Sequence, residues 1–94
     1  MNNYFIFLDP LMYVWSLGVI LFSMVTGEHP WDISNTNIML RQIVAGRYTI
    51  PSYLSQQCKD LIRGMLKTNP KERFTMKQIA EHEWMSKTTT SISP

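Results

Sequence analysis

The sequence predicts an all-α domain in which about four helices pack around a central apolar helix at residues 11–26. Residues 11–26 are apolar on every side, as expected for a helix in the middle of a domain. Residues 56–66 repeat their apolar side chains at the spacing of one helix face. Alternating strand patterns are scarce in the 94 residues, which suffice for one small domain.

The central helix has clear signals at both ends. Asp9-Pro10 is a plausible start, because proline suits the first helical turn. Thr26-Gly27 closes the helix, since glycine tolerates the left-handed backbone that ends many helices. His29-Pro30-Trp31 then turns the chain and is expected to insert the indole into the core.

A second helix is predicted at residues 37–45. The polar stretch 32–36 offers caps for its start, and Gly46 stops it. Residues 47–54 are expected to be irregular, with Pro51 fixing an extended or turn conformation.

Ser55 caps the predicted third helix, whose apolar residues follow the i, i+3, i+4, i+7, i+8 pattern without a miss. They are Cys58, Leu61, Ile62, Met65 and Leu66. Asn69-Pro70 breaks this helix. Thr75 and Gln78 form a capping box for a short fourth helix, which residues 81–85 end. Residues 87–94 are rich in Ser and Thr and are expected to form a disordered tail.

The composition argues against several function classes. The net charge of +2 is small, and the nine basic residues are scattered without a run, so we expect no nucleic-acid partner. Cys58 is the single cysteine, which leaves no internal disulfide and no multi-cysteine metal site. We expect it to be a buried apolar residue. His29 and His82 have no third ligand in a metal-binding pattern, so no metal site is predicted. Met24, Met65 and Met76 occupy apolar helical positions and are expected to fill the core.

No membrane segment is expected, although residues 4–25 are long and apolar enough to be considered. Asp9-Pro10 interrupts the stretch, and an acidic residue inside a span costs about 2.5–3.5 kcal/mol. No Lys or Arg precedes it, so no signal peptide is well formed. With a single cysteine, this favours a cytoplasmic or nuclear location.

Two stretches carry a resemblance to a known family. The segment Trp15-Ser16-Leu17-Gly18-Val19-Ile20-Leu21, followed by Thr26-Gly27 and Pro30-Trp31, closely resembles the central helix of the C-lobe of eukaryotic protein kinases and the loop after it. Leu54-Ser55, Lys59-Asp60-Leu61-Ile62, Met65-Leu66, Asn69-Pro70, Arg73 and Thr75 resemble the two kinase helices near the end of the domain, and His82-Glu83-Trp84 is similar to its closing segment.

The resemblance covers residues 14–86 and is nearest to calmodulin-dependent and AMP-activated Ser/Thr kinases. It divides the chain into a divergent segment at 1–10, a partial kinase domain at 11–86 and the tail at 87–94. The matched positions with structural roles in the family are Trp15, Gly18, Gly27, Pro30, Trp31, Pro70, Arg73 and Trp84.

The family transfers the γ-phosphate of ATP to protein Ser or Thr, with ATP and Mg as the cofactors of the complete domain. That chemistry needs a Gly-rich loop, a strand lysine, a helix glutamate, an HRD loop and a DFG loop. None of these motifs occurs here. We therefore expect no catalytic residue, no cofactor for this chain and no activity of the chain alone.

Two residues are expected to show the effect of the missing kinase motifs on the structure. Arg73 matches a kinase arginine that forms a buried ion pair with a glutamate of the Ala-Pro-Glu segment, which is absent here. An unpaired buried charge typically costs about 3–5 kcal/mol, so Arg73 is expected to turn to solvent or to pair with Asp9 or Glu72. Tyr13 stands where the family has a helix-capping aspartate; it either marks relaxed constraint or packs as one more aromatic.

Three hypotheses about the function of the chain follow. The first is an inactive fragment of a Ser/Thr kinase domain whose helix 11–26 has an exposed face that a protein partner could cover. The second is a binding or pseudokinase module, because kinases dock substrates and regulators on the helix matching 37–45, where Ile38, Met39 and Arg41 could form the surface. The third is the C-terminal part of an active kinase, either completed in trans or shortened by the gene model.

Overall fold

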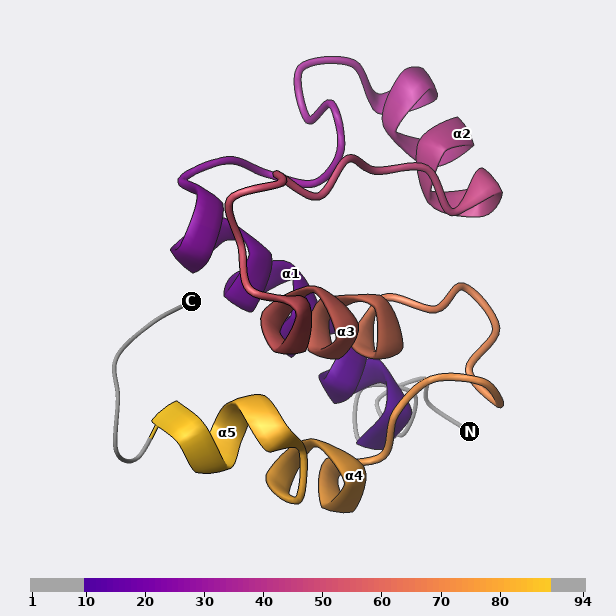
Figure 1. Cartoon of the computed structure of the whole chain (residues 1–94). Helices are drawn as coiled ribbons and strands as arrows, with labels where there is room; N and C mark the ends of the chain where they lie inside the picture. The colour runs from indigo at the N-terminus through magenta and orange to yellow at the C-terminus, as the bar shows by residue number, and fades with distance from the viewer. Residues whose placement is uncertain (1–9, 89–94) are drawn as a thin grey trace, which may run out of the picture.

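The computed structural model describes residues 10–88, which contain five helices and no strand. The helices are α1 (Pro10–Thr26), α2 (Thr36–Ala45), α3 (Gln56–Met65), α4 (Met76–Ala80) and α5 (Glu83–Thr88). Helix α3 packs against α1 and α5, while α4 packs against α1. Helix α2 stands apart from this group and is joined to it by two long connections (Figure 1). The predicted all-α class is confirmed.

The predicted caps form as the sequence indicates. Asn35 accepts a hydrogen bond from the backbone N–H of Ile38 at 3.1 Å, and Ser55 accepts one from Cys58 at 3.1 Å. Thr75 and Gln78 make both bonds of the capping box. Gly46 ends α2 with a φ of 66°, a left-handed conformation that glycine adopts without strain.

The sequence did not predict α5 as a separate helix. Its first turn is held by His82, whose Nδ1 accepts the backbone N–H of Trp84 at 3.1 Å. Histidine is not one of the usual N-cap residues, so no cap signal marked this start. Because α5 includes residues 87 and 88, the tail does not begin at 87 as predicted. Residues 1–9 and 89–94 lie outside the described part of the chain, as does the Asp9 half of the predicted start of α1.

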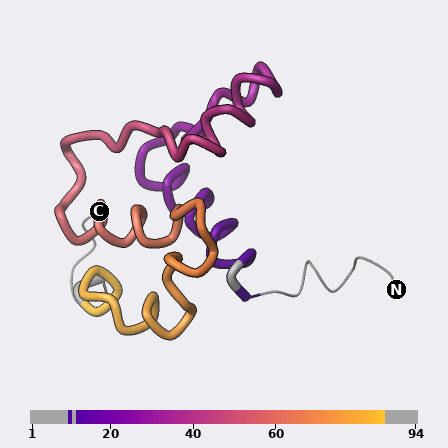
Figure 2. The backbone as a smooth tube through the Cα atoms, turned by 90° about the vertical axis from the view of Figure 1, so that its right-hand side faces the viewer, coloured from indigo at the N-terminus to yellow at the C-terminus, as the bar shows by residue number. Residues whose placement is uncertain are grey.

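Helix α3 supplies most of the core, which consists of two clusters. One contains Phe22, Trp31, Leu54, Cys58, Ile62 and Leu66. The other contains Val14, Leu61, Met65 and Ile79. Both clusters join α1 to α3, and all five apolar residues predicted on the face of α3 are buried. The tube view in Figure 2 shows α3 lying between α1 and the α4–α5 pair.

Helix α1 is covered on one side only. Val14, Gly18 and Phe22 are buried, but Leu17, Ile20 and Met24 on the other side are exposed. Met65 fills the core as predicted, whereas the prediction was wrong for Met24 and Met76, both of which are exposed. The sequence of α1 is therefore apolar on every side, but the fold covers only one of those sides.

Helices α1 and α3 approach each other closely at Gly18. A Cβ atom at this position would lie 2.9 Å from Leu66 Cδ2 and 2.9 Å from Met65 Cβ. Since real Cβ atoms do not come so near their neighbours, a side chain here would push α1 and α3 apart.

Replacing Gly18 with valine should lower the free energy of unfolding by about 1–3 kcal/mol, because the added methyl groups overfill the contact. Urea denaturation followed by circular dichroism at 222 nm measures this change. The matched control is Ser16→Val, which places the same side chain on an exposed part of α1 and should shift stability by no more than about 0.5 kcal/mol. Equal losses for both variants would contradict the close approach.

Candidate functional site

The most distinctive surface feature is a row of apolar side chains along α1. Tyr13, Leu17, Ile20 and Met24 follow one another at spacings of four, three and four residues, which places them on one side of the helix. We call these four residues the α1 stripe. Their exposed fractions are 47%, 39%, 53% and 77%, and Met12 beside them is also exposed. The prediction that one face of this helix lacks a cover is confirmed.

The α1 stripe is energetically costly to leave in water. Burying a large apolar side chain contributes about 1.5–3 kcal/mol, and contiguous apolar surface on a folded domain marks an interaction site. The same helix buries Val14 and Phe22 on its other side, so the stripe is held on a rigid element. Tyr13 belongs to this exposed row, so its ring does not pack into the core.

The turn after α1 is fixed by aromatic packing. Trp31 is buried and stacks on Trp15 with ring centroids 5.1 Å apart and planes 10° apart, as predicted for an inserted indole. Tyr48 contacts Trp31 edge-on at 6.4 Å. The backbone N–H of Trp31 donates to Nδ1 of His29 at 3.2 Å, and Pro30 is buried between them. His29 therefore shapes the turn.

Arg73 does not turn to solvent, which was one of its two expected outcomes; the other, pairing with Asp9 or Glu72, stays a prediction. Its side chain is 9% exposed, and its Nε donates to the carbonyl oxygen of Lys67 at 3.0 Å. A second nitrogen, Nη2, donates to the carbonyl oxygen of Thr68 at 3.3 Å. These carbonyls follow the last turn of α3, where the helix presents partial negative charge. Backbone oxygens, which the sequence search for carboxylates could not reveal, therefore accept from the guanidinium.

The predicted family positions do not gather in one place. Gly27 has a φ of 75° and lies exposed after α1, while Pro70 is exposed in the loop after α3. Trp84 on α5 is half-buried against both core clusters. Their separation fits structural roles in different parts of the fold. An additional contact that the sequence did not indicate joins α3 to the start of α5: His82 Nε2 lies 2.7 Å from Asp60 Oδ2.

The predicted docking residues of α2 do not all face outward. Ile38 and Arg41 are exposed, but Met39 is half-buried against the core cluster that contains Trp31. Leu40 and Val44 are exposed instead and, with Arg41 and Ala45, line a shallow apolar depression. Their i, i+4 spacing could have identified this surface from the sequence.

The described residues provide little for catalysis or metal binding. Within 10–88, no group of three or more His, Cys, Asp or Glu side chains could hold a metal ion. Cys58 is fully buried, and burial raises the pKa of its thiol, which disfavours the nucleophilic thiolate. Among the same residues, no helix has the length and apolar character needed to cross a membrane.

A comparison with known proteins identifies the family of this chain. The sequence profile of the protein kinase domain matches residues 8–85, which is most of the chain. The chain belongs to the protein kinase family. Within this kinase segment, α1 carries the Trp15–Gly18 motif and α3 to α5 carry the later matches. The predicted resemblance is thereby confirmed.

The relatives of this kinase segment are Ser/Thr kinases. It is 49% identical over 79 residues to a probable serine/threonine-protein kinase MARK-A of Dictyostelium discoideum, covering 84% of this chain and 8% of that protein. It is 43% identical over 76 residues to a human SNF-related serine/threonine-protein kinase, covering 81% of this chain and 10% of that protein. The values are the same for serine/threonine-protein kinase SIK1 of the mouse: 43% over 76 residues, 81% and 10%. The chain thus spans about a tenth of the length of these relatives.

Replacing Arg73 with methionine should lower the free energy of unfolding by about 1–3 kcal/mol, because the carbonyls of Lys67 and Thr68 lose a buried donor. Arg73→Lys should fall between the wild type and Arg73→Met, since an ammonium lacks the planar fork. Chemical denaturation checks both variants. Arg41→Met, on an exposed position of α2, is the control and should change stability by about 0.5 kcal/mol or less. An Arg73→Met variant as stable as this control would contradict the assigned role.

Proposed function

We propose that this chain is a scaffold segment of a Ser/Thr kinase domain that transfers no phosphate by itself and that binds another polypeptide through the α1 stripe. The observation that carries the proposal is the row of exposed apolar residues on a helix whose other side is buried. The activity class comes from the family and its Ser/Thr kinase relatives.

The chain's own residues support inactivity of the isolated segment. Phosphoryl transfer requires groups that cradle the phosphates, hold the metal ions and orient the attacking hydroxyl. The motifs that supply these groups in kinases do not occur in the 94 residues. ATP and Mg would therefore bind only where those motifs are present beside this segment, in the same polypeptide or in a second one.

The favoured partner of the α1 stripe is a polypeptide that carries the preceding parts of a kinase domain. The stripe is apolar and spans the helix from Tyr13 to Met24, so it suits another helix laid along it better than a small ligand. Such a complex would be an active kinase completed in trans.

A binding module is the second candidate function. It is supported by the exposed apolar depression on α2, lined by Leu40, Arg41, Val44 and Ala45 next to Ile38. Met39 and Ile43 pack α2 on the core, whereas Leu40 and Val44 stay exposed, so a protein bound there would contact side chains that do not hold α2 in place.

The isolated chain should self-associate through the α1 stripe. Sedimentation velocity of the wild type should show species larger than a monomer, and the triple variant Leu17→Gln, Ile20→Gln, Met24→Gln should shift them to monomer. The change removes side chains that each contribute about 1.5–3 kcal/mol when buried. The control is Ile33→Gln, Tyr53→Gln, Met76→Gln, three exposed large hydrophobic residues outside both α1 and the α2 depression, which should leave association unchanged. A monomeric wild type with a sharp unfolding transition would contradict the prediction.

Transfer of phosphate to a peptide should be detected only when the chain is mixed with a polypeptide that carries the missing motifs. The chain with ATP, Mg and a Ser-containing peptide should give no labelled peptide, whereas addition of a polypeptide carrying the N-lobe and catalytic loop of a relative should restore labelling. The stripe variant should reduce the restored rate more than tenfold, because docking depends on those side chains. Labelling by the chain alone would refute inactivity, and no labelling in any mixture would refute completion in trans.

A further inference from the structure

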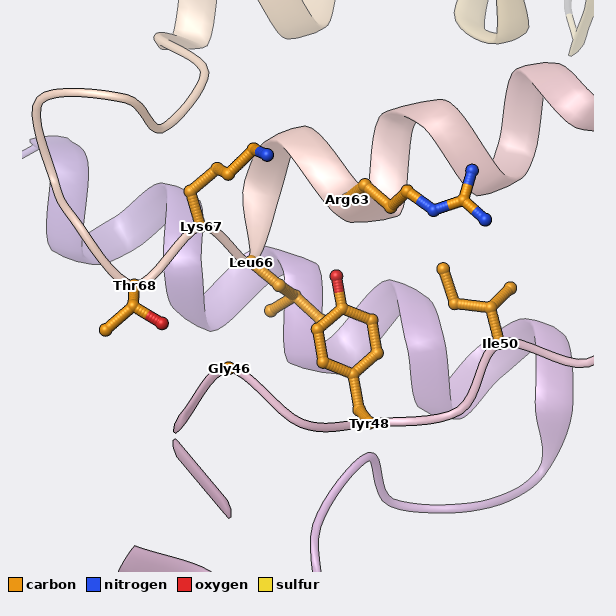
Figure 3. Close-up of a pocket in the computed structure, with 7 residues that line it drawn as sticks. All are labelled: Gly46, Tyr48, Ile50, Arg63, Leu66, Lys67 and Thr68. Carbon is orange, nitrogen blue, oxygen red and sulfur yellow. The ribbon is translucent and has the colours of Figure 1, made fainter. Parts of the chain in front are cut away.

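A pocket of about 390 Å³ opens between α3 and the extended segment that follows α2. Seven residues line it: Gly46, Tyr48, Ile50, Arg63, Leu66, Lys67 and Thr68 (Figure 3). It includes no residue of the α1 stripe and none of the exposed α2 residues. Neither the family motifs nor the proposed function assigns a role to it.

The charged residues that line the pocket are all positively charged. Arg63 lies in the last turn of α3 and Lys67 just after the end of that helix, and no Asp or Glu is among the seven lining residues. Within residues 10–88, neither cation forms an ion pair. Arg63 also borders a second depression, which includes Asp60 and Glu83, and the Asp60 carboxylate there lies 2.7 Å from His82 Nε2. Both cations are thus available to an incoming anion.

Tyr48 adds an uncharged hydrogen-bond donor to the lining of the pocket. Its ring is held edge-on against Phe22 at 6.2 Å and Trp31 at 6.4 Å. Figure 3 shows its hydroxyl pointing toward α3, between the side chains of Arg63 and Lys67 in this view. Burial raises the pKa of the Tyr48 phenol, an effect that the nearby Arg63 charge opposes. The hydroxyl therefore keeps its proton at neutral pH and can donate it.

The remaining lining is partly apolar, with Thr68 as its polar member. Leu66 is buried beneath the pocket, and Ile50 and the Tyr48 ring form its side. A small anion would leave this surface uncovered. A peptide with an apolar side chain flanked by carboxylates would cover it and also reach both cations.

We propose that this pocket binds an acidic peptide segment, with an apolar side chain against Ile50 and the Tyr48 ring and its flanking carboxylates on Arg63 and Lys67. Charge complementarity identifies the occupant, because the lining offers two cations and a hydroxyl donor with no competing acid. The site goes beyond the proposed function, since it needs neither ATP nor the α1 stripe.

The test uses the full 94-residue chain and a fluorescein-labelled peptide with one leucine between two pairs of glutamates, followed by fluorescence anisotropy. Arg63→Gln and Lys67→Gln should each weaken binding about three- to fivefold, the range of an exposed ion pair. Raising the salt from about 50 to 500 mM should also weaken it. A peptide with serine in place of leucine should bind less tightly, because the apolar surface then stays uncovered.

Lys77→Gln is the matched control, since it removes the same charge from an exposed position on α4, outside the pocket lining. This variant should bind like the wild type, and circular dichroism should show all variants folded. Equal losses at Lys77 and Lys67 would overturn the site, because they would indicate attraction to net charge. Unchanged binding in Arg63→Gln and Lys67→Gln would overturn it too, leaving these cations the role of balancing the C-terminal charge of α3.

A second measurement does not depend on variants or on the oligomeric state. A peptide with photoreactive benzoylphenylalanine in place of leucine is irradiated with the wild-type chain, and the crosslinked residues are mapped by mass spectrometry. Crosslinks within 46–50 or 63–68 support the proposal. Crosslinks confined to α1 or α2 overturn it and assign peptide binding to one of the surfaces described above.

Discussion

The contact between α1 and α3 at Gly18 is the constraint on which the rest of the structure depends. The absence of a side chain there lets Met65 and Leu66 come against the α1 backbone. This approach brings Val14 and Phe22 of α1 onto the buried face of α3 and so completes both core clusters. A domain of this size buries a modest share of its surface, so one close helix pair decides where its core lies.

The same contact leaves α1 with two unlike sides. One side packs on α3, and the other carries the α1 stripe, although the amino-acid pattern is apolar around the whole helix. Membership of the kinase family explains why such a helix is present: α1 to α5 belong to a segment of a protein kinase domain. The pocket beside Tyr48 has a different origin, since the aromatic packing that fixes the turn after α1 also orients this ring toward α3.

Local sequence signals predicted the structure correctly wherever the deciding interaction joins residues that are close together in the sequence. The caps at Asn35, Ser55 and Thr75 each bond a backbone N–H three residues further along, so residue type and spacing predict them. They failed at α5, where a histidine side chain performs the capping. At Arg73 they did not indicate the two backbone carbonyls that accept from the guanidinium, because every residue possesses such a carbonyl.

The sequence by itself determined the all-α class, four of the five helices, the buried face of α3 and the kinase family. These follow from periodicity, caps and motifs, which act within a few residues of the chain. Only the tertiary structure decided which side of α1 is exposed, that Met39 faces inward while Leu40 and Val44 face outward, and that Tyr48 meets Arg63 and Lys67 in one pocket. The physical reason is that burial and charge environment are set by whichever elements pack together, and residues far apart in sequence establish that packing.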